Sequence, residues 1–241
     1  MEKYHIEKVD TRQEIDIWVV DGALIRKELD AEFTNFGHHF SFSYIPSNEF
    51  WLDVETNLDE REFFIIHLFA EWKMQKKGAS HREARFLANQ KEAAARRKGG
   101  DLLNVLGKKS YPLMSRIHKK LLQKIGDLSV WQVSGRLVRS VFDLDFTAGG
   151  HDYVYSYVPD NEIWIDDDVS DAELLYVVLH ELSERRFMSK GMNYDWDNFI
   201  PYGSEFMRVH DDAHYRSSAI EQKARNDAAY LKKKLKFVGW R

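Results

Sequence analysis

Hydrophobic and polar positions along the chain repeat as a unit. Residues 18–78 and residues 131–191 align without a gap, 113 positions apart, and share one apolar pattern. Identical pairs include Trp18/Trp131, Gly22/Gly135, Arg26/Arg139, His38/His151, Trp51/Trp164, His67/His180 and Glu71/Glu184. Each copy is therefore an internal control for the other. Residues kept in both copies are expected to serve the fold, and residues found in only one are candidates for chemistry.

Each repeat begins with residues that predict a small sheet. The stretches IDIWVVDG and LSVWQVSG are typical of a strand followed by a turn. The runs HFSFSYI and DYVYSYV alternate aromatic with small or polar residues, as a half-buried strand does. A Pro-Ser-Asn or Pro-Asp-Asn turn leads from each run to EFWLDV or EIWIDDD. The two runs on either side of this turn are expected to pair as a hairpin.

Two helices are expected to follow the sheet. In the second repeat, Ser170 and Glu173 have the spacing of a capping box at the start of the first helix. A further helix is expected over residues 209–234, and the matching helix of the first repeat over residues 82–97. Within them, residues 212–225 match residues 83–96 at an offset of 129. The change from 113 to 129 places an insertion at roughly residues 195–210.

The whole pattern predicts an α+β protein of two homologous lobes, each a small antiparallel sheet with two helices. The first repeat is expected to span residues 14–98 and the second residues 128–235, with residues 99–127 as a helical linker. Within the linker, SYPLMSRIHKKLLQKIGD is amphipathic and basic on one side. Because no aromatic residue is interleaved with the basic ones, a solvated helix face is favoured over a phosphate-binding one.

Composition narrows the classes of function. The 241 residues carry a net charge of −4, which gives no general attraction to nucleic acid or to an anionic membrane. Cysteine is absent, so a metal site would have to use histidine and carboxylate ligands. The N-terminus lacks the apolar core of a signal peptide, and no apolar run reaches the roughly 18 residues of a membrane span. These features predict a cytoplasmic protein.

The two repeats diverge at one place along the predicted helices. The second copy reads LHELSERRFMSKGMNY where the first reads IHLFAEWKMQKKGASH, so Glu181 corresponds to Leu68. On the following helix, His214 corresponds to Arg85. The second repeat therefore carries a carboxylate and a histidine that the first repeat lacks.

These residues predict a metal site in the second repeat. His180 and Glu184 lie four positions apart, on one face of a helix. If the next helix packs against that face, His214 completes three zinc ligands and leaves one position for water. Zinc lowers the pKa of such a water toward about 7, and Glu181 is placed to accept its proton. Glu221 would be a fourth ligand or would hold a ligand in place.

An ion-pair cluster is the alternative reading of the same residues. His67, Glu71 and Glu92 of the first repeat match His180, Glu184 and Glu221, so the group could serve the fold in both copies. In the first repeat, Arg85 would supply the positive charge between Glu71 and Glu92, as a guanidinium in place of a metal ion. The metal hypothesis predicts one zinc ion per chain and a degenerate counterpart made of His67, Glu71, Arg85 and Glu92.

His151 follows a glycine, as His38 does in the first repeat. A turn or packing role explains a histidine that both copies keep. If the metal site exists, His151 is a candidate to line it, because it begins a predicted strand beside the helix.

The segment EIWIDDDVSDAELLYVVLHELSE resembles the core of zincin-like metallopeptidases, in which a strand precedes a helix whose His-Glu pair supplies a ligand and the general base. The resemblance implies that His180 is a ligand and Glu181 the base, on a variant H-E-x-x-E helix with Glu184 in place of the second histidine. The wider pattern, with an Ala-His pair before Glu221 and Arg225, is similar to small proteins of bacteria and their phages.

The sequence thus predicts a zinc-dependent hydrolase of metallopeptidase-like type, acting on an unknown protein or peptide. The alternative is a non-enzymatic binding or assembly protein, of the phage-encoded kind, in which the cluster or its metal only holds two helices together. The two differ in ligand number, because a catalytic zinc keeps a position open to water and a structural zinc does not. A nucleic-acid partner would rest on the linker helix alone, and no feature points to a membrane.

Overall fold

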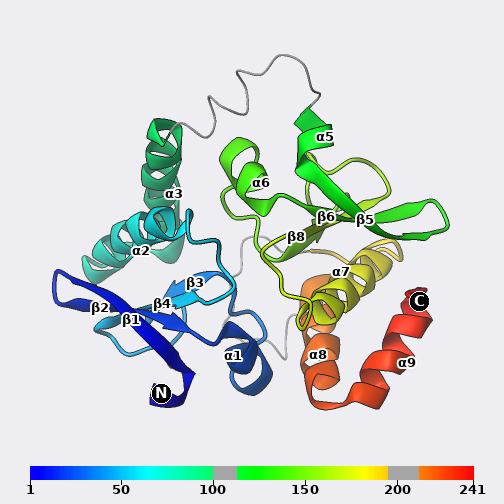
Figure 1. The fold of residues 1–241 in the computed structure, drawn as a ribbon, viewed down its shortest axis with the longest axis horizontal. Helices are drawn as coiled ribbons and strands as arrows, with labels where there is room; N and C mark the ends of the chain where they lie inside the picture. The colour runs from blue at the N-terminus through cyan, green and yellow to red at the C-terminus, as the bar shows by residue number, and fades with distance from the viewer. Residues whose placement is uncertain (100–112, 195–211) are drawn as a thin grey trace. The chain divides into compact units, whose positions relative to one another are not determined.

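A computed structural model describes residues 1–99, 113–194 and 212–241 (Figure 1). Each repeat forms a four-stranded sheet packed with helices, which confirms the α+β class and the two similar lobes. Within these three ranges, no helix combines the length and the apolar character needed to cross a lipid bilayer.

The two sheets have the same topology. The first has the order β1-β2-β4-β3, built from β1 (His5–Arg12), β2 (Ile15–Val20), β3 (Phe36–His38) and β4 (Glu49–Asp53). The second has the order β5-β6-β8-β7, built from β5 (His118–Ile125), β6 (Leu128–Val133), β7 (Gly149–His151) and β8 (Glu162–Asp166). Even the register repeats, with Trp18 opposite Trp51 and Trp131 opposite Trp164.

Both sheets are mixed, so the prediction of antiparallel sheets is wrong in one respect. β2 pairs with β4, and β6 with β8, in parallel, while the other pairs are antiparallel. A helix that the sequence pattern did not predict follows β2, namely α1 (Gly22–Glu28), and its counterpart α6 (Gly135–Val141) follows β6. Each helix starts a crossover, and a parallel pair requires such a connection.

The runs HFSFSYI and DYVYSYV are turns, not strands. In the first, the amide of Phe42 donates to the carbonyl of His38, and the amide of Ile45 donates to the carbonyl of Phe42. Phe42 is buried against Phe33, with 5.4 Å between ring centroids. The alternation of aromatic and small residues therefore comes from consecutive turns that bury every second or third side chain, and only the short β3 and β7 are strands.

One long helix of each repeat, α2 (Arg61–Lys76) or α7 (Leu174–Met188), packs on the sheet, and the next helix, α3 (His81–Lys98) or α8 (Ala213–Asn226), packs on that helix. The second repeat also contributes α9 (Ala228–Val238). The predicted helix over 209–234 is thus two helices, because Asp227 has an extended backbone and its carboxylate caps α9 at the amide of Tyr230. α7 begins only at Leu174, after a turn closed on the carbonyl of Ser170, and no capping box forms there.

The prediction of a helical linker over residues 99–127 is wrong for the second half of that range. Residues 118–125 form β5, and only Leu113–Ile117 (α5) is helical in the part of the linker that the structure describes. The repeat therefore starts earlier than predicted, since β1 and β5 are also 113 positions apart. Pairing with β6 overrides the helical spacing of the apolar residues, because Leu122 and Ile125 pack against the core of the second sheet.

Each compact unit of the fold contains a segment from the other repeat. Unit 1 comprises residues 1–22, 33–117 and 136–146, and unit 2 comprises residues 23–32, 118–135 and 147–241. α1 therefore belongs to the unit of the second repeat, and α6 to the unit of the first. The predicted boundaries, which treat each repeat as one lobe, miss this exchange.

Buried ion pairs bind the exchanged helices into their units. In unit 1, Arg139 of α6 donates to both carboxylate oxygens of Glu60, at 2.9 and 2.5 Å, and both side chains are fully buried. Arg96 of α3 donates to the same carboxylate at 2.6 Å. Unit 2 repeats the arrangement, since Arg26 and Arg225 both donate to Glu173. The predicted cap residue Glu173 is thus the centre of a buried ion-pair group.

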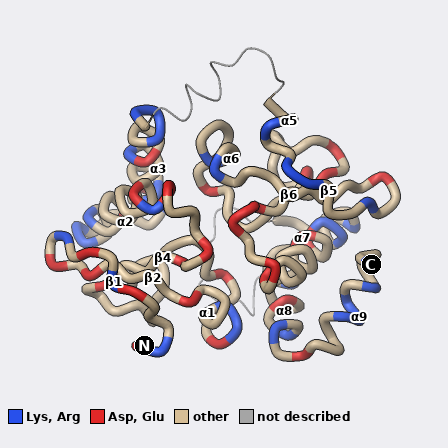
Figure 2. The backbone as a smooth tube through the Cα atoms, in the orientation of Figure 1, with Lys and Arg blue, Asp and Glu red and all other residues tan. Residues whose placement is uncertain are grey.

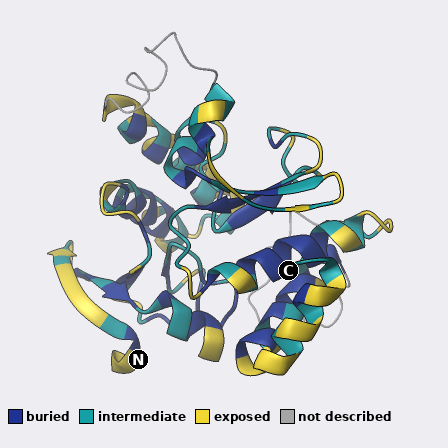
Figure 3. Ribbon diagram, turned by 45° about the vertical axis from the view of Figure 1, so that its right-hand side comes forward, coloured by how far each residue is buried: buried dark blue, intermediate teal, exposed yellow. Residues whose placement is uncertain are grey.

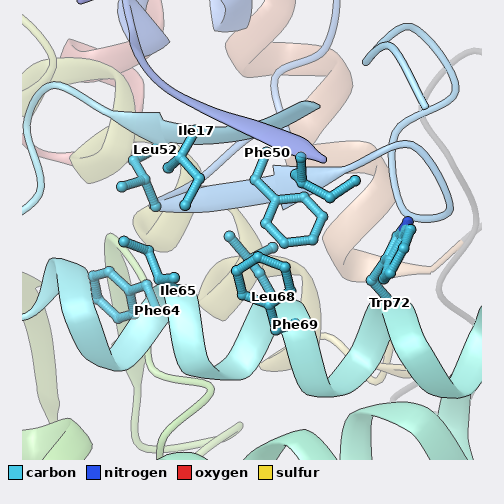
Figure 4. Packing of buried hydrophobic residues seen from close by; sticks show 9 residues of the cluster. Ile17, Phe50, Leu52, Phe64, Ile65, Leu68, Phe69 and Trp72 are labelled. Atoms are coloured by element: carbon cyan, nitrogen blue, oxygen red, sulfur yellow. The ribbon is translucent and has the colours of Figure 1, made fainter. Parts of the chain in front are cut away.

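The core of unit 1 lies between its sheet and α2. Ile17 and Phe50 of the sheet pack against Phe64, Leu68 and neighbouring side chains of the helix (Figure 4). An equivalent cluster in unit 2 joins β6 and β8 to α7 and adds Leu235 of α9. The edge strand β1 is largely exposed (Figure 3). These cores hold α2 and α7 rigidly, with one helix face available for the polar residues described next.

Candidate metal centre

α7 and α8 of unit 2 bring three donor atoms together. His180 Nε2 lies 3.3 Å from both Glu184 Oε2 and His214 Nδ1. His214 Nδ1 lies 2.8 Å from Glu184 Oε2. These three side chains are positioned to hold a metal ion. α7 and α8 are in direct contact, as the predicted convergence requires.

The outer nitrogen of each histidine is held by a carboxylate. His180 Nδ1 lies 2.9 Å from Glu221 Oε2, and His214 Nε2 lies 2.9 Å from Glu32 Oε2. Each outer nitrogen must carry a proton to make its bond, so the neutral form of each ring points a lone pair inward, toward Glu184. Three acceptors at this spacing repel one another unless protons or a cation lie among them. Carboxylates behind ligating histidines are the usual support of a metal site.

The distances fit a tetrahedral ion. Zinc–nitrogen and zinc–oxygen bonds of about 2.0–2.1 Å at the tetrahedral angle separate two ligands by roughly 3.3–3.4 Å. The two distances from His180 are both 3.3 Å, while the 2.8 Å between His214 and Glu184 is shorter. The side chains of this chain therefore fit a zinc-class ion with a small opening of the His214–Glu184 pair.

His151 and Glu181 lie on the other side of Glu184. His151 Nε2 is 3.0 Å from Glu184 Oε1, and its Nδ1 accepts a hydrogen bond from the amide of Tyr153. The His151 ring is completely buried, yet its Nε2 has no hydrogen-bond partner of good geometry. Donor atoms of His151, Glu181 and Glu184 form a second group within 4.8 Å of one another. The structure thus places His151 at the site as well as in the packing around it.

Histidines with raised pKa values balance the carboxylates of the group. Burial alone would lower the pKa of His180, but its bonds to Glu184 and Glu221 raise that pKa to about 10. The pKa of His214 is likewise raised, against burial, by Glu32 and Glu184. Burial would raise the pKa of Glu184, but its histidine partners lower it. In the protein as described, protons supply the positive charge that these carboxylates require, and a metal ion could replace them.

Glu181 differs from the other carboxylates of the site. Burial, assisted by the charge of Glu184, raises the pKa of Glu181 to about 7. Its side chain lies over Gly149, where a Cβ atom would approach Glu181 Oε1 to 2.9 Å. The first repeat has Phe36 in place of Gly149 and Leu68 in place of Glu181. The second repeat has thus exchanged an apolar pair for a glycine and a carboxylate that titrates near neutral pH.

The first repeat keeps an ion-pair cluster at the equivalent place. His67 Nδ1 lies 2.9 Å from Glu92 Oε2, and His67 Nε2 lies 3.6 Å from Glu71 Oε2. His81 Nδ1 approaches Glu71 Oε1 to 3.2 Å. Arg96 donates to Glu92 at 2.8 Å. Burial lowers the pKa of His81, whereas bonds to Glu71 and Glu92 raise that of His67, so His67 and Arg96 supply positive charge around Glu71 and Glu92.

The predicted role of Arg85 is wrong. Its guanidinium pairs with Asp145, at 3.0 Å from Nη2 to Oδ1, and its side chain is 41% exposed. Asp145 belongs to the exchanged segment of unit 1 and is the counterpart of Glu32 in unit 2. Arg85 and Asp145 thus replace the pair His214 and Glu32, and Arg85 is not the cation between Glu71 and Glu92.

Sequence reasoning missed two further residues of the site. Glu32 supports His214 from a position 182 residues away in the chain, and only its acidic counterpart Asp145 could have drawn attention to it. The ring of Tyr194 lies 5.5 Å from that of His214, and burial raises its pKa. The insertion predicted at residues 195–210 lies outside the described residues.

The acidic run at the end of β8 has a structural role. Asp167 accepts a hydrogen bond from the amide of Gly135 at 3.0 Å and pairs with Lys119. Asp166 accepts one from the amide of Asp168. A Cβ atom at Gly135 would collide with Asp166, as one at Gly22 would with Asp53, which explains why both repeats keep the glycine and the aspartate.

Comparisons with protein-family models, with curated proteins and with solved structures found no match for the chain. Any statement about its function must therefore be argued from the residues and their geometry.

The cluster of the first repeat makes stability depend on pH. Burial would lower the pKa of His67, but bonds to Glu71 and Glu92 raise it to about 9. Because this folded-state pKa exceeds the usual 6.5, the stabilisation is complete below about pH 6.5 and is lost as pH rises toward 9. We expect the free energy of unfolding to fall by up to about 3 kcal/mol over this window. Urea titrations at several pH values should show a fall in the free energy of unfolding that is larger in the wild type than in His67→Gln, because His180 and His214, whose pKa values are also raised, contribute equally to both proteins. If the free energy of unfolding depended on pH in the same way in both proteins, the prediction would be contradicted.

Exchanging one residue should give the first repeat the ligands of the second. Arg85→His would place an imidazole beside His67 and Glu71, with Asp145 available to hold its outer nitrogen as Glu32 holds that of His214. We expect this variant to bind one more zinc ion per chain than the wild type, measured by equilibrium dialysis with elemental analysis. Arg82→His, on the same helix, is the control. An unchanged zinc content would show that the two sites are not equivalent.

Proposed function

We propose that unit 2 is a zinc-dependent hydrolase of metallopeptidase-like type, with one zinc ion per chain. The observation that carries the proposal is the convergence of two histidine nitrogens and one carboxylate oxygen, each histidine held from behind by a second carboxylate. A buried carboxyl group that titrates near neutral pH lies beside them. Structural ion pairs do not require such a group, whereas hydrolysis does.

Under this proposal His180, Glu184 and His214 hold the ion. When bound, zinc would lower the pKa of a water molecule toward about 7 and polarise a substrate carbonyl. Glu181, whose carboxylate lies in one group with donor atoms of His151 and Glu184, accepts the proton of the attacking water. As the carbon–nitrogen bond of the substrate breaks, Glu181 returns this proton to the leaving nitrogen, so that acid and amine are released.

The remaining residues would position these groups. Glu221 and Glu32 fix the ring orientations of His180 and His214. Gly149 leaves room above Glu181, where the first repeat has the bulk of Phe36. The likeness of the strand and helix to zincin-like metallopeptidases favours a protein or peptide substrate, with Glu184 as the third ligand where that family has histidine.

Glu181→Gln separates catalysis from structure. Glutamine keeps the shape of the side chain but cannot accept a proton, and Glu181 is not a zinc ligand in this proposal. We expect an unchanged zinc content and melting temperature, with hydrolysis of a peptide-library substrate reduced by at least about a hundredfold. Glu7→Gln, the same substitution at an exposed residue of β1 in unit 1, is the control for altered charge. Full activity in Glu181→Gln would eliminate Glu181 as the base.

A non-enzymatic role is the second candidate, and one observation favours it. The first repeat keeps the bonds of His67 to Glu92 and Glu71 without the third ligand, so this cluster holds two helices together there. The two candidates differ in solvent access to the ion. In cobalt-substituted protein, acetohydroxamate should shift the visible absorption bands if a ligand position is open. Bands that do not respond would favour the structural role.

A further inference from the structure

Unit 1 has a groove along the helices α2 and α3. Its volume is about 440 Å³, and it runs between α2, α3 and the β1–β2 turn. The floor is apolar and includes Ile66, Phe69 and Leu87, and the rim is basic. The groove lies wholly within unit 1 and shares no residue with the metal centre.

The second repeat shows what kind of element such a surface accepts. In unit 2 the equivalent surface is covered by α9, whose Leu235 is buried in a core cluster that contains Leu182, the counterpart of Phe69. Phe237 of α9 lies under the guanidinium of Arg186, 4.6 Å from the ring centroid, and Arg186 is the counterpart of Lys73. The carbonyl of Gly239, just after α9, accepts a hydrogen bond from Gln123. The surface in unit 2 therefore fits an amphipathic helix.

Unit 1 has no counterpart of α9 among the residues that the structure describes, and residues 100–109, which align with α9 at the offset of 129, lie outside those residues. The groove occupies the place that α9 fills in unit 2, because Lys73 and Phe69 line it. α9 presents Leu231, Leu235 and Val238, spaced i, i+4 and i+7, to its groove. An occupant of the groove in unit 1 needs apolar side chains at the same spacing.

The charge of the rim distinguishes the two surfaces. Lys73, Lys77 and Lys91 are exposed at the groove of unit 1, and within the described ranges none of them pairs with a carboxylate. Figure 2 shows Lys and Arg positions along α2 and α3. Lys91 replaces Ile220, an apolar residue that packs in the core cluster together with α9. Arg12, a fourth cation of the groove, is already paired with Asp10 and Glu62. Lys73 also lies 5.6 Å from the centroid of the Phe69 ring. An occupant that meets three lysines without a carboxylate partner among the described residues should carry acidic residues beside its apolar ones.

We propose that this groove binds an amphipathic helix of a partner protein, with apolar residues at i, i+4 and i+7 flanked by glutamate or aspartate. The apolar residues would fill the floor at Phe69 and Leu87, and the acidic ones would meet Lys73, Lys77 and Lys91. The partner helix would occupy in trans the place that α9 occupies in cis in unit 2.

A designed peptide tests the proposal on the full-length protein. The probe is a fluorescein-labelled peptide with the sequence of α9, stapled on its outer face to hold the helix, in which Lys232, Lys233, Lys234 and Lys236 are replaced by glutamate. We expect fluorescence anisotropy to report binding in the micromolar range. The same stapled peptide with the native lysines should bind at least about tenfold more weakly, because it meets a basic rim.

Two charge-matched variants of the protein locate the binding. In the first variant, the three lysines of the groove are replaced by glutamate (Lys73→Glu/Lys77→Glu/Lys91→Glu). Its affinity for the acidic peptide should fall by at least about tenfold, and its affinity for the basic peptide should rise. The second variant, Lys232→Glu/Lys233→Glu/Lys236→Glu, makes the same change of net charge on exposed residues of α9. Its affinity for each peptide should stay within about twofold of the affinity of the wild type. Circular dichroism verifies that both variants are folded.

Four outcomes would overturn the proposal. No binding at up to about 1 mM peptide would mean that the groove does not accept a helix. If both triple variants bound the acidic peptide equally weakly, the net charge of the protein alone would attract the peptide. Binding that appears only after Leu102→Ser/Leu103→Ser would mean that the chain covers its own groove. A concentration-dependent dimer that Lys73→Glu/Lys77→Glu/Lys91→Glu abolishes would mean that the occupant is a second copy.

Discussion

Glu60→Ala is expected to destabilise unit 1 by about 3–5 kcal/mol, the largest effect of any single substitution considered for this protein. Glu60 is fully buried and accepts hydrogen bonds from Arg96 and Arg139, which are also buried. Alanine would leave two guanidinium groups in the interior without the carboxylate that they share. The loss should appear as a lower urea midpoint for the unfolding of unit 1.

The neighbouring Asp59 supplies a matched control. It also pairs with an arginine of α6, since Arg136 Nη1 lies 2.6 Å from Asp59 Oδ2, but its side chain is 69% exposed. An exposed ion pair contributes at most about 1 kcal/mol, so Asp59→Ala should shift the midpoint only slightly. If Glu60→Ala and Asp59→Ala had similar small effects, α6 would not be an integral part of unit 1, and the exchange of helices between the repeats would be unsupported.

His214→Ala is expected to remove zinc from the protein. This substitution deletes one of three ligands, and two ligands on one helix turn, His180 and Glu184, do not form a complete site. His67→Ala makes the same change in the first repeat and should leave the zinc content unaltered. Both contents can be measured by elemental analysis after dialysis against trace zinc.

Glu32→Gln gives a graded test of the same site. Glutamine can still contact His214 Nε2, but it removes the charge that holds the ring and strengthens the ligand. Substitutions of this kind typically weaken metal binding by about 10–100-fold. Equal zinc affinity in Glu32→Gln and the wild type would mean that His214 does not ligate through its inner nitrogen.

The duplicated sequence was sufficient to predict the α+β class and the convergence of α7 and α8. The spacing of His180 and Glu184 places them on one helix face, and the change of alignment offset identified α8 as the next helix. Strand direction was not predictable in the same way. The aromatic alternation in HFSFSYI arises in turns, and nothing in the local pattern of β2 and β4 distinguishes a parallel from an antiparallel pair.

The exchange of helices explains why part of the site could not be predicted. Glu32 and Asp145 each lie in a segment that joins the unit of the other repeat, so aligning the repeats shows that both are acidic but not what they contact. Arg85 was correctly aligned with His214, yet its partner was misassigned because Asp145 comes from that exchanged segment. Glu92 instead pairs with His67 and Arg96, which lie nearer in the chain.

The metal content of the wild-type protein tests the central claim most directly. The protein would be purified without chelator or added metal, exchanged into metal-free buffer and examined by elemental analysis together with amino-acid quantification. Three convergent ligands in unit 2, and an ion-pair cluster in their place in unit 1, predict about one zinc-class ion per chain. No bound ion would show that protons alone neutralise the cluster, and two ions would show that the repeats have not diverged in the way proposed.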